Sequence, residues 1–108
     1  MDAAVVRHLD DERDFEAFVT SHEVVLVEFY TTGCPKCAAM EPVLGTVARA
    51  TGVPVGLCDL GSVPVVERFD IASTPTLILF TNGDPADRLA EGFVGADRLV
   101  EFVDAVQE

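Results

Sequence analysis

Residues 24–37 read VVLVEFYTTGCPKC, an apolar run followed by a pair of cysteines. Its first seven residues are β-branched, aromatic or aliphatic and are apolar on both faces apart from Glu28, which is typical of a strand covered on both sides. Cys34 and Cys37 follow at C-x-x-C spacing, and Pro35 between them suits the first turn of a helix. The stretch therefore predicts a buried strand that leads into a helix, with Cys34 at or near the helix N-cap.

Outside this stretch, strand and helix signals alternate along the chain. Apolar residues at i, i+3, i+4 and i+7 predict amphipathic helices, and short apolar runs predict strands. Such alternation favours an α/β fold, a three-layer sandwich whose mixed sheet is parallel in the middle and antiparallel at one edge. The expected order is β-α-β-α-β-α-β-β-α, with strands at 5–9, 24–30, 53–59, 76–81 and 88–94 and helices at about 11–22, 35–51, 62–69 and 96–106.

Capping and breaking residues set the expected ends of these elements. Asp10 or Asp11 can cap the first helix by accepting hydrogen bonds from its free N–H groups, and Gly52 is a stop for the second. Pro42 falls inside the second helix, where we expect a kink. Asn82-Gly83 tolerates positive φ at both residues and predicts a hairpin.

Length and composition limit the possible functions. The 108 residues suffice for a single domain, 1–108, and 49% hydrophobic residues supply a core. The net charge of −12 would repel nucleic acids and anionic membranes. No signal peptide is evident, and no apolar run is long enough to cross a bilayer. We expect a cytoplasmic monomer.

The predicted position of the first cysteine favours its ionised form. Free N–H groups and the positive end of the helix dipole meet at an N-cap, where a thiolate is stabilised by roughly 0.3–2 kcal/mol. Pro35 has no N–H, so the donors left for the Cys34 sulfur are Lys36 and Cys37. Cys37 lies one turn further along the helix, on its apolar face, and should be more buried. This asymmetry predicts an attacking thiol and a resolving thiol.

Two charged residues accompany the cysteines. At ~7 Å in high dielectric, Lys36 would add only about 0.6 kcal/mol to the stabilisation of Cys34, and salt would screen it. It is either a solvated surface residue or a minor activator. Burial should raise the pKa of Glu28, which could then exchange protons with the Cys37 thiol. The alternative places Glu28 at a strand edge or end, where it reaches water.

Other readings of the cysteines are less well supported. A structural zinc site normally takes four protein ligands, and only Cys58, His8 and His22 remain, with no second paired motif, so we expect no metal. Cys58 is expected to be a small buried hydrophobe, with a regulatory thiol as the alternative. The Thr74-Pro75 bond, taken alone, is expected to be an ordinary trans bond.

Taken together, these residues resemble the thioredoxin family over essentially the whole chain. The resemblance rests on Val27 to Tyr30 leading into the cysteine pair, Pro42 five residues after Cys37, the Thr74-Pro75-Thr76-Leu77 loop, Asn82-Gly83, and Val94-Gly95-Ala96 before the last helix. It implies the thioredoxin fold and a thiol–disulfide oxidoreductase that reduces protein disulfides without a cofactor beyond the Cys34–Cys37 disulfide. It also implies a thioredoxin reductase or another dithiol donor as a partner.

The resemblance assigns roles to individual residues. Cys34 would be the nucleophile that forms a mixed disulfide with the substrate, and Cys37 would resolve it. Glu28 would take the place of the family's buried aspartate as proton acceptor for Cys37. Pro75 would be a cis-proline beside the cysteines, with the Thr74 backbone pairing to the substrate. Gly33, Pro35 and Lys36 would complete the substrate-binding surface.

Some residues depart from the family pattern. Gly33 stands where thioredoxins usually carry Trp, and Pro35-Lys36 replaces Gly-Pro, so the motif is closer to glutaredoxin-like proteins. A Gly-Gly-Asp glutathione signature is not evident, and the span from Gly83 to Gly95 suggests an extended hairpin. The alternatives are therefore a glutaredoxin-like protein that uses a small thiol, or a non-enzymatic binding module with this fold.

The acidity has a pattern of its own. Acidic residues lie on the expected exposed helix faces, as in Asp10 to Glu12 and Asp97 with Asp104, whereas the segment from Thr31 to Met40 contains no acid and the only lysine. We interpret the charge as a solvated face and hypothesise adaptation to high salt, where screening relieves self-repulsion.

Overall fold

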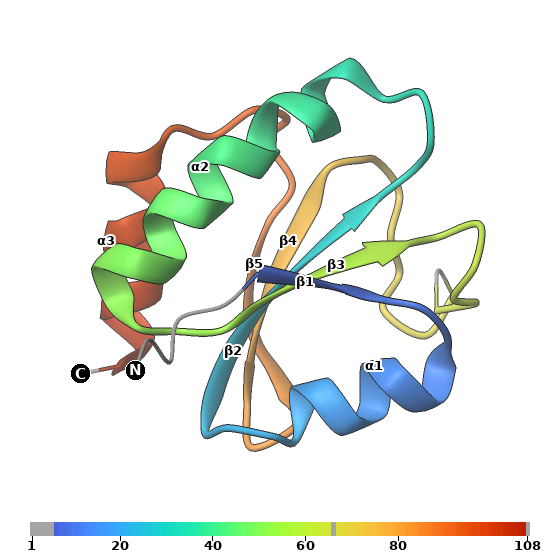
Figure 1. The fold of residues 1–108 in the computed structure, drawn as a ribbon, viewed down its shortest axis with the longest axis horizontal. Coiled ribbons are helices and arrows are strands. Elements are labelled where there is room, and N and C mark those ends of the chain that lie inside the picture. Colours follow the sequence, from blue (N-terminus) through green and yellow to red (C-terminus); the bar gives the residue numbers. More distant parts are fainter. Residues whose placement is uncertain (1–5, 66, 108) are drawn as a thin grey trace.

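A computed structural model describes residues 6–65 and 67–107 and contains one five-stranded mixed sheet with three helices (Figure 1). Within these ranges, no helix is both long and apolar enough to cross a membrane. The elements follow in the order β1 (Val6–Leu9), α1 (Glu12–Val19), β2 (Val24–Tyr30), α2 (Pro35–Thr51), β3 (Val55–Asp59), β4 (Thr76–Thr81), β5 (Asp84–Leu89) and α3 (Ala96–Gln107).

The strand order β1-β3-β2-β4-β5 places β2 at the centre of the sheet. β1 and β2 run parallel to β3, whereas β4 runs antiparallel to both β2 and β5. The prediction of a sheet that is parallel on one side and antiparallel at the other edge is confirmed. Glu28 on β2 is opposite Leu57 on β3 and Leu77 on β4, so it is paired on both sides.

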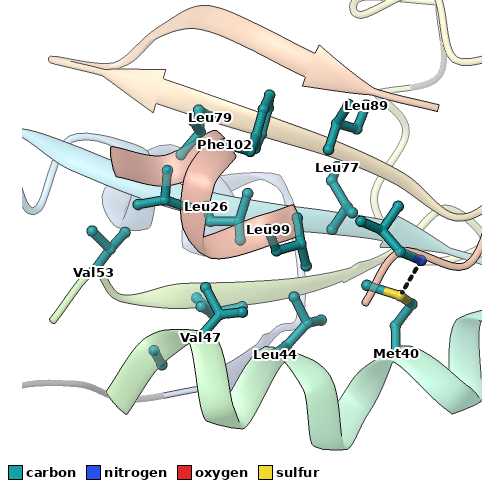
Figure 2. Packing of buried hydrophobic residues seen from close by; sticks show 14 of the residues in the cluster. Leu26, Met40, Leu44, Val47, Val53, Leu77, Leu79, Leu89, Leu99 and Phe102 are labelled. Atoms are coloured by element: carbon teal, nitrogen blue, oxygen red, sulfur yellow. Dashed lines mark hydrogen bonds between the residues drawn. The ribbon is translucent and has the colours of Figure 1, made fainter. Parts of the chain in front are cut away.

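Helices cover both faces of the sheet (Figure 1). On one face, α2 and α3 pack their apolar residues against Leu26 of β2 and Leu79 of β4 (Figure 2). On the other face, α1 packs against Val27 of β2, together with the segment between β3 and β4. Because successive side chains of a strand point to opposite faces, Glu28 lies on the face of Leu26, under α2.

The helix ends follow the predicted caps. Asp11 is the N-cap of α1, where its side chain accepts a hydrogen bond of 2.8 Å from the Asp14 N–H. Gly52 ends α2 in the left-handed conformation, with φ of 75°. The helix passes through Pro42. His22, the last residue of the helix expected at about 11–22, lies beyond the end of α1 and is exposed.

The helix expected at 62–69 is not a helix, and the described residues there form turns. Two isolated i→i−4 hydrogen bonds form there, from the Val63 N–H to the Asp59 carbonyl and from the Phe69 N–H to the Val65 carbonyl. Asp70 then takes a left-handed φ of 57°, which ends the turn. Pro64 also disfavours helical backbone at Val63, the residue that precedes it. The third strand begins at Val55 rather than Val53, and Val5 lies outside the described residues.

The returning strand expected at 88–94 lies earlier, at Asp84–Leu89. Asn82 and Gly83 both have positive φ, 52° and 86°, which matches a two-residue hairpin turn. Such a turn places Thr81 directly opposite Asp84, so β4 and β5 pair from the first residue after the turn. The sequence Asp84 to Arg88 reads as a polar loop because this edge strand is exposed, and exposed edges favour charge and proline.

Candidate active site

Cys34 is the N-cap of α2. Its Sγ accepts a hydrogen bond of 3.2 Å from the Cys37 N–H, one of the two donors expected. Gly33 immediately before it has a φ of 83°, a left-handed conformation that glycine adopts without strain. Cys34 and Cys37 form a disulfide with their Cα atoms 5.2 Å apart. The predicted cysteine pair at a helix N-terminus is therefore present in its oxidised form.

The two cysteines differ in exposure as expected. Cys34 is partly exposed, whereas Cys37 is only 4% exposed on the inner side of α2. A disulfide-bearing substrate can therefore reach the sulfur of Cys34 but not that of Cys37. Cys34 is therefore the more accessible of the two sulfurs, as a nucleophile needs to be.

The loop before β4 lies against Cys34. The Thr74–Pro75 peptide bond is cis, as the resemblance implies, so the trans bond expected from base rates is wrong. The Thr74 hydroxyl donates to the Cys34 sulfur at 3.7 Å, and the Thr74 carbonyl oxygen lies 4.0 Å from the same sulfur. Thr76 braces the loop by donating a hydrogen bond of 2.6 Å to the Ser73 carbonyl.

A pocket of about 180 Å³ lies behind the disulfide and includes Glu28 among its lining residues. Glu28 is 1% exposed, so the alternative of a solvated strand end is wrong. Its Oε2 has no hydrogen-bond partner within the described part of the chain. Burial, and then the negative charge of Glu41, raise the pKa of Glu28 to about 8. The lining comprises Glu28, Tyr30, Thr31, Thr32, Gly33, Cys34, Cys37, Ala38 and Glu41.

Sequence reasoning missed Glu41 in this pocket. It lies four residues after Cys37 on α2, and residues four apart on a helix share a face. That spacing is the signal that would have placed its carboxylate on the same side of α2 as Cys37.

Lys36 and Pro35 are exposed at the start of α2, as is Gly33 before it. A Cβ built on Gly92 would lie 3.6 Å from Lys36 Nζ, so the lysine lies along the segment that precedes α3. The buried Met40 Sδ accepts a hydrogen bond of 3.3 Å from the Val94 N–H, which ties that segment to α2 (Figure 2). Phe93 in the same segment is 51% exposed and was not singled out from the sequence.

The residues proposed as further metal ligands lie elsewhere. Cys58 is buried with α1 on the opposite face of the sheet, where burial and then Asp59 raise its thiol pKa to about 12. His8 stacks edge-on against Tyr30, with ring centroids 6.5 Å apart. No group of three or more His, Cys, Asp or Glu side chains suited to a metal occurs among residues 6–65 and 67–107. The zinc alternative therefore has no set of ligands there.

A disulfide at a helix N-terminus, with one accessible sulfur facing a cis-proline loop and one buried above a carboxylic acid, defines a thiol–disulfide oxidoreductase. The thioredoxin family model matches residues 5–105. The chain belongs to the thioredoxin family and is a protein-disulfide reductase.

Individual relatives support this assignment. Thioredoxin of Mycobacterium tuberculosis is 38% identical over 91 residues, which cover 82% of this chain and 78% of the relative. The bifunctional thioredoxin reductase/thioredoxin of Mycobacterium leprae is 32% identical over 107 residues, 96% of this chain but 23% of that protein. These matches favour the thioredoxin reading over the glutaredoxin-like and binding-module alternatives.

Solved structures support the fold. A mutant thioredoxin from Halobacterium salinarum superposes with a TM-score of 0.91 at 23% identity, over 100% of this chain and 96% of that one. Thioredoxin of Schistosoma mansoni gives a TM-score of 0.81 at 19% identity, over 97% of this chain and 98% of that one.

Proposed function

We propose that this chain reduces protein disulfides with Cys34 as the nucleophile, Cys37 as the resolving thiol and Glu28 as the proton acceptor for Cys37. The observation that carries the proposal is the unequal exposure of the two sulfurs above a buried, unpartnered carboxyl oxygen. An exposed thiolate can enter a mixed disulfide, while a buried thiol needs a nearby base before it can attack.

The reaction begins when the Cys34 thiolate attacks one sulfur of the substrate disulfide. A new bond joins Cys34 to that sulfur, and the second substrate sulfur leaves as a thiolate that takes a proton from water. The Cys37 thiol then passes its proton to the Glu28 carboxylate and attacks the Cys34 sulfur. The Cys34–Cys37 disulfide forms, and the first substrate sulfur leaves and is protonated. The substrate gains two electrons, and the protein dithiol loses them.

The surface around Cys34 positions the substrate. Thr74 lies beside the reactive sulfur and the cis-proline Pro75 follows it, and the Thr74 backbone is suited to pair with an extended substrate segment. Gly33, Pro35 and Lys36 frame the other side. Cys34 is partly exposed between them, so a protein disulfide can approach.

The oxidised protein needs an electron donor to start another cycle. A thioredoxin reductase is the donor we propose, since one relative carries thioredoxin reductase and thioredoxin in a single chain. The Cys34–Cys37 pair itself carries the electrons, so the proposed cycle uses no further cofactor. We also place the protein in the cytoplasm, as a single-domain monomer. Its net charge of −12 argues against nucleic acids and anionic membranes as partners.

The proposal is tested with a model disulfide protein, a dithiol donor and purified variants. Cys34→Ser should abolish reduction, and Cys37→Ser should accumulate a mixed disulfide through Cys34. Cys58→Ser is the matched control, because it removes a thiol on the other face of the sheet, and it should retain activity. Reduction that survives Cys34→Ser would overturn the proposal.

The acidity supports a second proposal about the environment. Acidic residues on the outer faces of the helices, such as Glu12 of α1 and Asp97 and Asp104 of α3, are exposed or half-buried. We propose that the protein works at high salt, where a Debye length of ~3 Å at 1 M screens this self-repulsion.

A further inference from the structure

Two carboxylates share the pocket behind the disulfide. Glu28 of β2 and Glu41 of α2 both line it, and Glu41 lies one helical turn after Cys37. Glu28 is buried at the centre of the sheet, whereas Glu41 is exposed at its end of the pocket. The pocket thus joins the buried carboxyl of Glu28 to the exposed side chain of Glu41.

No counter-charge offsets this pair among the residues that line the pocket. The other titratable groups there are Tyr30 and the two cysteines. From β1, His8 contacts Tyr30 from the side, and from β3, Asp59 is opposite Tyr30 and adds a further negative charge. The strand neighbours of Glu28 itself, Leu57 and Leu77, are apolar. Lys36, the only lysine of the sequence, lies along Gly92 instead.

We propose that Glu41 is a positioning residue that controls, through the shared pocket, when Glu28 can take the proton of Cys37. The proposal rests on the role proposed above for Glu28. Glu41 does not touch the reacting sulfurs in this scheme and acts on them through Glu28 alone. Each cycle moves one proton from Cys37 Sγ to the Glu28 carboxylate and then to the water that reaches the pocket.

The direction of the effect follows from the charges. Burial raises the pKa of Glu28, and the negative charge of Glu41 raises it further, to about 8. Around neutral pH most Glu28 carboxyls therefore hold a proton, and only the ionised fraction can accept another from Cys37. Removing the charge of Glu41 should enlarge that ionised fraction, so proton transfer from Cys37 to Glu28 should begin at lower pH.

The test measures the release of substrate from the Cys34 mixed disulfide against pH, by rapid mixing. In Glu41→Gln, the pH midpoint of this step should fall by about half a unit, the size of an ordinary partly screened charge interaction. Glu41→Asp should keep the wild-type midpoint, because it keeps the charge. Titration of the Glu28 carboxyl carbon by NMR should show the same downward shift, which a merely structural role for Glu41 would not produce.

Two controls separate the possible outcomes. Glu101→Gln removes one exposed charge from α3, which lines no part of the pocket, and should leave the midpoint unchanged. In a Glu28→Gln background, adding Glu41→Gln should have no further effect, because the group it acts through is gone. If Glu28→Gln abolishes the pH midpoint but Glu41→Gln does not move it, the inference about Glu41 is overturned and the role of Glu28 stands. A midpoint that Glu28→Gln leaves unchanged overturns the proposed role of Glu28 as well.

Discussion

The hydroxyl of Thr74 lies 3.7 Å from the sulfur of Cys34, a residue 40 positions earlier in the chain. The same loop places the Thr74 carbonyl oxygen 4.0 Å from that sulfur. Cys34 is thus held between two donors of different origin, the Cys37 N–H of its own helix and the hydroxyl of the loop before β4. Both short-range donors act regardless of salt, unlike the charge of Lys36.

Replacing Thr74 by Val should slow the reaction of Cys34. The substitution removes the hydroxyl donor at nearly constant volume, and a hydrogen bond of this kind contributes about 0.5–1.5 kcal/mol. Alkylation of Cys34 in the reduced protein at pH 7 should fall by roughly two- to tenfold. Thr74→Ser is the control that keeps the hydroxyl. Equal alkylation rates for Val and wild type would show that the loop does not stabilise the thiolate.

Much of this site could be predicted from the stretch that joins β2 to α2. Cys34 at the N-cap, Cys37 buried and Glu28 beneath the helix all follow from local periodicity and strand alternation. The approach of Thr74 to Cys34 and the cis bond at Pro75 do not, since tertiary packing determines them.

The errors in the predicted fold have similar physical causes. The turn-rich segment after β3 contains helix-forming spacing, but the left-handed Asp70 ends it after one turn. The strand β5 is polar because it is an exposed edge, so its pattern resembles a loop. In both segments, local pattern was outweighed by the position of the segment in the fold.

The pKa of Glu28 predicts a pH dependence of stability. Its value of about 8 in the folded protein lies above the ordinary 4.5 of the unfolded chain. The native state therefore binds the extra proton between these values, and the free energy of unfolding falls as pH rises through them, by at most about 1.4 kcal/mol per pH unit. Glu28→Gln should remove this slope. Urea unfolding of the oxidised proteins from pH 5 to 9 measures it, and parallel curves for the two proteins would contradict the prediction.

Cys58 should be chemically silent in the folded protein. It is fully buried, and burial raises its thiol pKa to about 12. Alkylation of the reduced native protein should modify Cys34 rapidly and leave Cys58 unmodified until urea is added. Cys58→Ala should retain disulfide reduction and lose roughly 1 kcal/mol of stability to the vacated space. Mass spectrometry that finds Cys58 modified under native conditions would refute this and support a regulatory thiol.

Salt should stabilise the protein if its acidity is an adaptation. Raising KCl from 0.1 to 1 M shortens the Debye length from ~10 to ~3 Å and screens the repulsion among the acidic residues. The free energy of unfolding, measured with urea, should rise over this range. Equal stability with and without molar KCl would remove the basis for placing the protein in a saline environment.

Gly56 on β3 should not tolerate a side chain. A Cβ there would lie 2.8 Å from Phe18 Cε2 and 2.9 Å from Leu9 Cδ1, so Gly56→Ala must displace packed core groups and should cost about 1–3 kcal/mol. Gly45→Ala is the matched control, because its Cβ would meet only the end of the Arg49 side chain, at 3.6 Å. In the helix α2 the control should gain about 0.5–1 kcal/mol. Thermal unfolding compares the two variants directly. A Gly56→Ala protein as stable as wild type would show that α1 and β1 can move away from β3 at no cost.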